Sequence, residues 1–276
     1  MDILEIARLE EARLAIGCSE ISDATLPIKS GGVACRGVPG WWNNMAVGVG
    51  MNGPVAREEV DQIATWYEST GIEPRIEVCP HADPSLIKHC EALNFRVRNF
   101  DNVLFRELSG DEHVRPAQTP DPTISLRVVD KSNDAEIREY SRISMTGNSP
   151  PGFVMPDADY ELAARVVKHP RTVSFIASVR VGSSTHDAGA GGLELHHEIA
   201  CLFGLSTLHN FRKRGVQQSL IAARLNLAAS KGVRVATIGS RPGAGTERNV
   251  RRMGFQTAYT KVILARAGTG LVPARG

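Results

Sequence analysis

The chain has 276 residues, of which 42% are hydrophobic and 22% charged, a composition typical of globular proteins and not of disordered ones. No apolar run reaches the roughly 18–20 residues that a membrane-spanning helix needs, and the acidic, amphipathic start of the chain differs from a signal peptide. Five widely spaced cysteines without a Cys-x-x-Cys pair argue against a disulfide framework and a zinc ribbon. We therefore expect a soluble, cytoplasmic protein.

The charged residues are distributed unevenly along the chain. Residues 1–108 contain 16 acidic and 10 basic side chains, whereas residues 123–276 contain 11 acidic and 21 basic ones. Residues 109–122 add three acidic side chains and one basic, which brings the net charge of the whole chain to +2. A basic half of this kind either forms a solubilising surface or meets an anionic partner.

Helices and strands are predicted in the same order in both halves of the chain. In the first half, apolar spacing predicts helices over 60–67 and 86–93, with strands over 75–79 and 102–105. The same order returns as helices over 220–229 and 247–253, with strands over 234–238 and 261–264. The repeat also appears in matched landmark residues, namely Pro54, Gly71, Phe95 and Arg106 in the first half and Gly215, Gly232, Phe255 and Arg266 in the second. This repeat predicts two related α/β domains in tandem, each a mixed, mostly antiparallel sheet flanked by helices.

A proline-rich stretch separates the two predicted domains. Residues 109–122 contain three prolines and only one sizeable aliphatic side chain, so we expect a linker that buries little surface. The predicted domains therefore span residues 1–108 and 123–276. A second proline-rich patch, residues 148–156, is expected to form a loop over a site.

A glycine pattern in the first half points to a dinucleotide site. Residues 48–53 read Gly-x-Gly-x-x-Gly after a predicted strand, but a dinucleotide fold needs the third glycine inside the opening helix and an acidic residue at the end of the next strand. Here Pro54 follows the pattern, and Glu77 lies within its strand. An NAD(P)-dependent enzyme is therefore less favoured than the two interpretations reached below.

Metal and nucleic-acid binding receive less support still. Cys79, His81, His89 and Cys90 carry ligand atoms, but no recognised spacing unites them, so no metal site is expected. Aromatic residues make up 5% of the chain, and its three tryptophans lie in the acidic half, which leaves the basic half without an obvious stacking platform for nucleic acid.

The most informative segment joins an apolar strand to a long helix through a basic turn. The predicted strand covers residues 200–208, the turn contains Arg212, Lys213 and Arg214, and Gly215 precedes the helix. The first N–H groups of a helix lack partners within it and lie at the positive end of its dipole, and Gly215 has no Cβ to hinder a close approach to the backbone. We interpret the segment as a phosphate or pyrophosphate site, since cations there otherwise oppose the dipole.

Two motifs in this half resemble a known family. Residues 212–217 (Arg-Lys-Arg-Gly-Val-Gln) resemble the Arg/Gln-x-x-Gly-x-Gly/Ala pyrophosphate loop of the GNAT superfamily, the acetyl-CoA-dependent N-acetyltransferases. Residues 247–255 resemble the second signature of that family, an Asn-bearing helix that ends in Gly-Phe. The resemblance covers residues 123–266 and keeps the order of strand, loop and helix.

The resemblance implies a set of acetyl-CoA contacts. Main-chain groups of one strand would pair with the pantetheine arm, the loop would hold the pyrophosphate, the following helix would contact the cofactor from the other side, and strand 233–238 would part from its neighbour to admit the thioester. The cofactor-binding residues implied in this way are Leu205, Ser206, Thr207, Arg212, Lys213, Arg214, Gly215, Val216, Gln217, Asn249 and Arg252.

Two positions depart from the family pattern. Gln217 replaces the small residue usual at the end of the loop, although its amide remains. Val250 stands where many members place a tyrosine that protonates the departing thiolate. The general acid is then absent, or is supplied by Tyr259 or water, or is unnecessary because a thiolate leaves readily. For the general base, a strand over residues 192–198 makes Glu194 a candidate, with a solvated hairpin end as the alternative.

The first half lacks the features that the second half offers to a cofactor. In the aligned repeat, Met51-Asn52-Gly53-Pro54 replaces the basic loop; it contains no cation, and Pro54 lacks a backbone N–H. The favoured interpretation is thus an N-acetyltransferase with a degenerate first domain, whose second domain binds acetyl-CoA and transfers its acetyl group directly to a primary amine of a small molecule or peptide. The main alternative is a non-catalytic acyl-CoA sensor. Both a monomer and a homodimer are compatible with the sequence.

Overall fold

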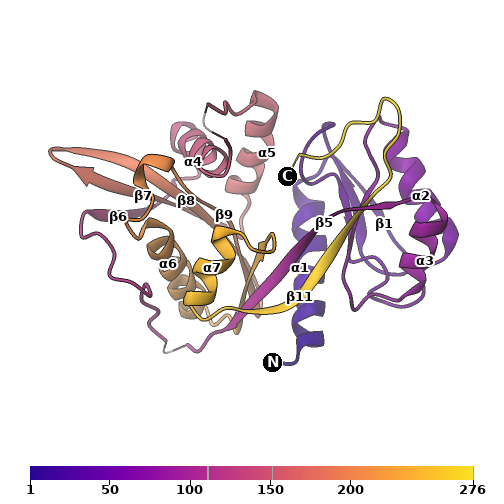
Figure 1. Ribbon diagram of the computed structural model, residues 1–276, viewed down its shortest axis with the longest axis horizontal. Coiled ribbons are helices and arrows are strands. Elements are labelled where there is room, and N and C mark those ends of the chain that lie inside the picture. The colour runs from indigo at the N-terminus through magenta and orange to yellow at the C-terminus, as the bar shows by residue number, and fades with distance from the viewer. Residues whose placement is uncertain (111, 151, 276) are drawn as a thin grey trace. The chain divides into compact units, whose positions relative to one another are not determined.

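The computed structural model describes residues 1–110, 112–150 and 152–275 and divides the chain into two compact units (Figure 1). Unit 1 contains Met1–Val103 and Thr257–Gly276, and unit 2 contains Leu104–Gln256. Asp111 of the predicted linker, Pro151 of the predicted loop and Gly276 lie outside the described residues. Within the described residues, no helix combines the length and apolar character needed to cross a bilayer.

Unit 1 is a mixed sheet with three helices. Its elements are α1 (Ile3–Ile21), β1 (Ala24–Pro27), β2 (Val33–Arg36), β3 (Met45–Val47), α2 (Arg57–Glu68), β4 (Arg75–Val78), α3 (Ser85–Ala92), most of β5 (Arg96–Glu107) and most of β11 (Gln256–Ala265). Strands β1, β2 and β3 are antiparallel neighbours, β3 and β4 are parallel, and β11 lies antiparallel to β4. Its core gathers beneath α2, where Val60, Ile63 and Tyr67 are buried.

Unit 2 repeats this plan with longer strands. Its elements are the end of β5, β6 (Ile124–Val128), α4 (Asp134–Thr146), α5 (Asp157–Lys168), β7 (Thr172–Val181), β8 (Ser184–His196), β9 (Ile199–Thr207), a single 3-10 turn η1 (His209–Phe211), α6 (Val216–Ser230), β10 (Val235–Ser240) and α7 (Gly245–Arg252). Strands β6 to β9 are antiparallel neighbours, and β10 lies parallel to β9.

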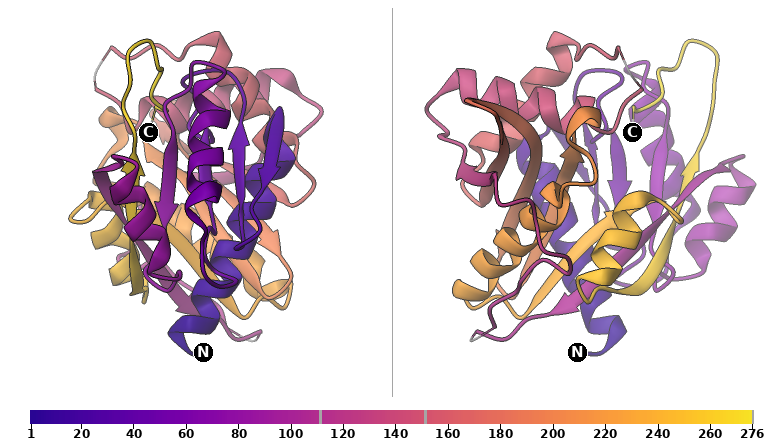
Figure 2. Two further views of the ribbon diagram at one scale, coloured as in Figure 1. Left: turned by 90° about the vertical axis from the view of Figure 1, so that its right-hand side faces the viewer. Right: turned by 60° about the vertical axis from the view of Figure 1, so that its left-hand side comes forward.

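The sheet of unit 2 is covered on both faces. Leu193 and Leu202 pack with Leu220 and Leu225 of α6 on one face, while Ile176 packs with α4 on the other. Figures 1 and 2 show α4 and α5 on one side of strands β7 to β9 and α6 on the opposite side. The alternation along β8 and β9 therefore divides their side chains between an α6 face and an α4 face.

The predicted fold class is confirmed, because both units are mixed sheets flanked by helices. The order β–α–β–α–β occurs as β3-α2-β4-α3-β5 and again as β9-α6-β10-α7-β11, with a parallel strand pair in each copy. The sequence spacing that predicted a repeat thus corresponds to elements of the same kind in the same order.

The units do not follow the boundaries predicted at residues 108 and 123. The chain leaves unit 1 within β5 and returns to it within β11, so the last twenty residues group with the first unit. The cause is strand pairing, since Val262–Ala265 of β11 lie in register with Arg75–Val78 of β4. Periodicity along the sequence predicts a strand but does not specify which sheet the strand joins.

The predicted linker packs against unit 2. Val114, its one sizeable aliphatic residue, is buried in the core of that unit. The Val114 N–H donates to Asn226 Oδ1 at 2.8 Å, and Asn226 Nδ2 donates to the Val114 carbonyl at 3.0 Å. Further along, the Gln118 N–H donates to Gln218 Oε1 at 3.0 Å. One well-placed side chain and two side-chain amides of α6 thus hold a segment expected to bury little.

Candidate functional site

The amino-terminal end of α6 presents a row of backbone N–H groups without partners. In the described part of the chain, no hydrogen bond is made by the N–H groups of residues 213–218. The preceding residue, Gly215, has φ +92°, and no side chain caps the helix or places an acid in its first turn. A helix start with orphan donors and a positive dipole end is suited to an anion.

Three cations of the surrounding loop and helix lack an acidic partner. Arg212 and Lys213 are exposed, and Arg252 on α7 is exposed as well. Among described residues, none of the three lies within ion-pair distance of a carboxylate, although Arg212 Nη2 donates to the Gly147 carbonyl at 3.0 Å. Arg214, by contrast, pairs with Asp121 at 3.4 Å. The structure therefore gathers uncompensated positive charge around orphan donors.

Gly215 was expected to leave room for a ligand beside the backbone, but that room is occupied by the chain itself. A Cβ at this position would lie 3.0 Å from Pro120 Cα, so the missing side chain makes room for the chain's own segment. The Asp121 N–H then donates to the Arg214 carbonyl at 3.0 Å. Hydrogen bonds from Thr123, and then the nearby Arg214, lower the pKa of Asp121. The segment around Pro120 thus covers one side of the loop, and an anion has to approach from the other.

Side-chain hydrogen bonds between predicted site residues join helix α7 to the first turn of α6. Asn249 Nδ2 donates to Gln217 Oε1, and Arg252 Nη1 donates to Asn249 Oδ1 at 3.3 Å. The structure thus brings together Gln217, Asn249 and Arg252, which lie up to 35 positions apart in the sequence. Val250 faces the core and is fully buried, so its position offers no proton donor.

Strands β9 and β10 part where the thioester slot was expected. Their parallel pairing runs from Ile199 with Val235 to Leu202 with Ile238 and stops there. Residues 203–207 of β9 therefore lie beyond the last pair, and the ladder between β8 and β9 also shifts register close to Gly192. The parted region includes the three residues expected to line the pantetheine arm, Leu205, Ser206 and Thr207.

The groups of these three residues are engaged to different degrees. Ser206 Oγ is buried and donates to the Ile143 carbonyl at 2.7 Å. Asn148 Nδ2 donates to the Leu205 carbonyl at 3.1 Å, although a carbonyl can accept a second hydrogen bond. Thr207 Oγ1 is buried and has no partner among the described residues. An orphan hydroxyl beside orphan amides fits a polar, phosphate-bearing ligand.

Asn148 belongs to a contact that sequence reasoning missed. Asn148 follows the end of α4, and the Gly147 carbonyl just before it accepts the hydrogen bond from Arg212. His209 Nε2 also lies 3.3 Å from the Ser149 carbonyl. The proline-rich patch predicted to cover a site thus begins beside β9 and the basic loop, but its proline spacing does not predict which residues make the contact.

Glu194 is largely buried on the α4 face of β8. It lies in register with Thr172 of β7 and Cys201 of β9, and its Oε1 is 3.6 Å from Arg171 Nη2. Cys201 precedes the last residue of β9 that pairs with β10. Glu194 therefore lies just before the parting of the strands, within ion-pair distance of Arg171.

Tyr259 lies in unit 1, not with the loop residues of unit 2. It is buried, and its hydroxyl donates to Glu11 Oε1 at 2.8 Å, while Lys261 Nζ lies 2.9 Å from the same oxygen. Burial, and then the neighbouring Glu11, raise the pKa of Tyr259 well above its ordinary value. A hydroxyl held in this way within the core of unit 1 is a poor source of a proton for a thiolate, which argues against the general-acid role considered for it.

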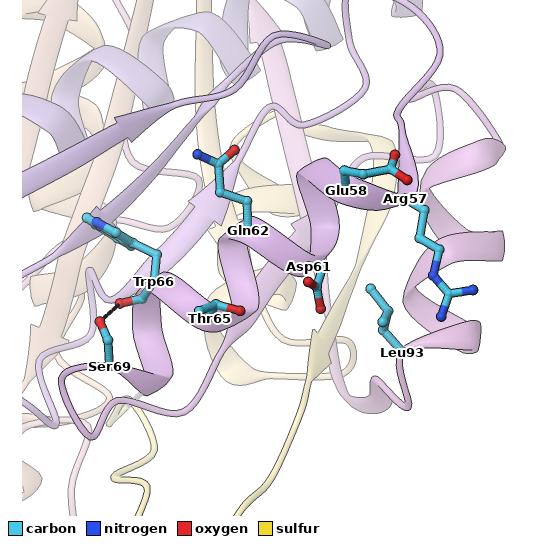
Figure 3. A pocket seen from close by; sticks show the side chains of 8 residues that line it. All are labelled: Arg57, Glu58, Asp61, Gln62, Thr65, Trp66, Ser69 and Leu93. Atoms are coloured by element: carbon cyan, nitrogen blue, oxygen red, sulfur yellow. Dashed lines mark hydrogen bonds between the residues drawn. The ribbon is translucent and has the colours of Figure 1, made fainter.

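Two surface hollows lie away from the α6 site. One lies along α2 in unit 1 (Figure 3) and is lined by Arg57, Glu58, Asp61, Gln62, Thr65, Trp66, Ser69 and Leu93. Another lies between α4 and α5 and includes Tyr160 and Arg165. Neither is lined by a residue predicted to contact a cofactor.

Two sequence patterns remain, the Cys and His residues at positions 79–90 and the Gly-x-Gly pattern at residues 48–53. Among described residues, no group of three or more His, Cys, Asp or Glu side chains could hold a metal ion. Burial raises the pKa of Cys79 to about 11 and that of Cys90 to about 12. The last glycine of the Gly-x-Gly pattern, Gly53, lies in the turn that precedes α2 and not inside the helix.

Comparisons with known proteins identify the fold. No protein-family model and no curated protein sequence matches the chain. A GCN5-related N-acetyltransferase from Kribbella flavida superposes with a TM-score of 0.67 at 17% identity, covering 95% of this chain and 97% of that one. An acetyltransferase assigned to the GNAT family from Novosphingobium aromaticivorans gives a TM-score of 0.55 at 16% identity, covering 94% and 97%. A tandem GNAT protein from the clavulanic acid biosynthesis pathway gives 0.56 at 13% identity, covering 85% and 77%.

Proposed function

We propose that this chain, which has the fold of the GNAT acetyltransferases, transfers an acetyl group from acetyl-CoA to a primary amine within a ternary complex. The observation that carries the proposal is the start of α6, where six N–H groups make no hydrogen bond to a described residue and lie near three cations that have no described acidic partner. A diphosphate carries the charge and the acceptor oxygens that such a helix start lacks.

The cofactor would be held by unit 2 along two connected surfaces. Backbone donors of residues 213–218 would bind the diphosphate, with Arg212, Lys213 and Arg252 adding charge. Thr207 and the outer edge of β9 would bind the pantetheine arm, which would leave the thioester between the parted strands β9 and β10. Acetyl-CoA supplies an acyl group on a good leaving group, so the protein's task is to position the two reactants and to handle one proton.

Glu194 would accept the proton that the attacking amine must lose, directly or through water. Nitrogen attacks the thioester carbonyl, the carbonyl oxygen takes up negative charge, and the C–S bond then breaks to release the CoA thiolate. No residue of the enzyme becomes acylated in this sequence. Because Val250 is buried and aliphatic, the thiolate would leave without a protein general acid, or water would supply the proton.

The proposal is tested by release of free thiol from acetyl-CoA in the presence of a panel of small amines and short peptides. We expect turnover with at least one amine and none without an amine. We also expect Glu194→Gln to lower kcat by about 100-fold or more while acetyl-CoA affinity remains the same. An unchanged kcat and pH–rate profile in folded Glu194→Gln would remove Glu194 from the mechanism.

A non-catalytic acyl-CoA sensor is the second candidate. It is favoured by two observations, the buried Val250 at the position of the usual proton donor and the contact of Glu194 with Arg171. A sensor would bind acetyl-CoA and release no thiol with any amine of the panel. Binding with turnover would exclude it.

A further inference from the structure

Arg224 lies in the middle of α6 and is completely buried. Its Nε donates to the Leu220 carbonyl at 2.9 Å, and its Nη1 donates to the Gly192 carbonyl at 2.9 Å and to the Phe203 carbonyl at 3.2 Å. Its Nη2 has no partner among the described residues, nor does any described carboxylate form an ion pair with it. A buried cation without a counter-charge is costly to a fold, so a purely structural reason for its presence is weak.

The guanidinium occupies the place where β8 and β9 lose their register. Gly192 and Phe203 are partners in that ladder, and the shift lies between Ala190 and Gly192. Gly191 makes room for the arginine, because a Cβ there would lie 2.9 Å from Arg224 Cζ. Burial lowers the pKa of Arg224 to about 10, which leaves the group charged at neutral pH.

Of the two strand carbonyls that accept from Arg224 Nη1, the one on β9 belongs to Phe203, the first residue after the last β9–β10 pair. That pairing ends at Leu202, so the Phe203–Gly204 peptide is the first one beside the parted strands. The C=O and N–H of a trans peptide point in opposite directions. Since Arg224 holds the Phe203 carbonyl on the β8 side, the Gly204 N–H is directed toward the side that β10 has left.

We propose that Arg224 is a positioning residue for acyl transfer, which fixes and polarises the Phe203–Gly204 peptide so that the Gly204 N–H donates to the thioester carbonyl. The inference rests on the proposed function. A cation bonded to a peptide carbonyl strengthens the donor at the other end of that peptide. In a site from which water is excluded, such a preorganised donor stabilises the negative charge that develops on the carbonyl oxygen. Arg224 touches neither reactant.

The test uses infrared difference spectra of bound acetyl-CoA that is isotope-labelled at the thioester carbonyl carbon. A stronger hydrogen bond to this carbonyl lowers its stretching frequency. We expect a lowered frequency in the wild type, a return toward the value in water for Arg224→Met, and a partial return for Arg224→Lys. The affinity for acetyl-CoA should not change, because the amides at the start of α6 remain intact. With an amine identified by thiol release, kcat should fall by about tenfold to a hundredfold in Arg224→Met.

Two further variants keep the test independent of folding. Gly191→Ala retains the arginine but displaces its guanidinium, and it should reproduce part of the shift if Arg224→Met does not fold. Leu162→Ala, which removes a buried side chain of α5, lowers the stability of unit 2 and should leave the frequency at the wild-type value. An unshifted frequency in folded Arg224→Met or Gly191→Ala would overturn the inference, as would an equal shift in Leu162→Ala. If the wild type binds no acetyl-CoA, the proposed function itself fails.

Discussion

Helices α2 and α6 follow corresponding strands in the two units, yet their first turns differ. The chain supplies an acidic hydrogen-bond acceptor at the start of α2 and none at the start of α6. At α2, Glu59 accepts hydrogen bonds from the N–H groups of Ala56 and Ser30, both at 2.9 Å. The Val55 N–H donates to Ser85 Oγ at 2.8 Å. At α6, the first turn contains no acidic side chain, and its orphan N–H groups lie beside exposed cations.

The comparison shows how one structural plan gives either a closed or an open helix start. At α2, Glu59 accepts from the Ala56 N–H, and the charges of Glu58 and Glu59 offset the positive end of the dipole, which stabilises the helix and repels an anion. Removing these acids and adding cations reverses both effects. We infer that unit 1 has closed its helix start and that unit 2 has kept it open for a phosphate-bearing ligand.

The largest expected effect comes from reversing the charges before α6. Arg212→Glu with Lys213→Glu removes two charge-assisted contacts of about 1.5 kcal/mol each, which corresponds to a loss of roughly 100-fold in acetyl-CoA affinity. Calorimetric titration measures this loss directly. The matched control is Arg57→Glu in the first turn of α2, which should leave the affinity unchanged. Equal losses in both variants would remove the distinction between the two helix starts.

A smaller effect is expected from giving α6 the acid that α2 possesses. Gln217→Glu places a carboxylate among the orphan amides, so we expect acetyl-CoA affinity to fall by roughly tenfold through about 1–2 kcal/mol of repulsion. The same carboxylate should raise the free energy of unfolding by about 0.5 kcal/mol. Chemical denaturation and calorimetry measure the two quantities. A gain in both, or a loss in both, would contradict the comparison, and Gln217→Ser serves as the uncharged control.

A smaller change again is expected from Asp121→Asn. This substitution removes the carboxylate that pairs with Arg214 at 3.4 Å and leaves a side chain that can still accept from Thr123. One negative charge fewer beside the loop should raise acetyl-CoA affinity by roughly two- to threefold, an effect that added salt should diminish. Reduced affinity would show that Asp121 orients Arg214 for binding instead of competing with the ligand.

No effect on affinity is expected from opening the start of α2. Glu59→Ala leaves the N–H groups of Ala56 and Ser30 without their acceptor, which should lower the free energy of unfolding by about 1 kcal/mol. The thermal midpoint reports this loss, while titration should still find unaltered acetyl-CoA binding. Appearance of a second binding event in this variant would mean that only the cap keeps unit 1 from binding.

The sequence was sufficient for features that depend on local pattern. Apolar spacing predicted the helices now seen as α2, α3, α6 and α7, and the basic turn that ends at Gly215 predicted where the long helix α6 begins. The motif positions also led to Gln217, Asn249 and Arg252, which the structure joins by hydrogen bonds. The helix predictions succeed because caps, turns and periodicity are encoded by residues near one another.

Features that depend on long-range pairing could not be predicted in the same way. Strand β11 joins β4, so Tyr259 enters the core of unit 1 where local pattern suggested a catalytic role. Val114, in the segment predicted to be a linker, is buried in the core of unit 2. Arg224 had one overlooked signal, a single arginine within an otherwise apolar stretch of helix, but only the structure shows that it reaches Gly192 and Phe203.

The central claim is most directly tested by calorimetric titration of the whole chain with acetyl-CoA. The account predicts one acetyl-CoA per chain, and it predicts that the combined Arg212→Glu and Lys213→Glu substitutions weaken binding by roughly 100-fold while the protein remains folded. Two molecules per chain would contradict the claim that the α2 start is closed. Absence of binding to the wild type would contradict the claim that the α6 start is a cofactor site.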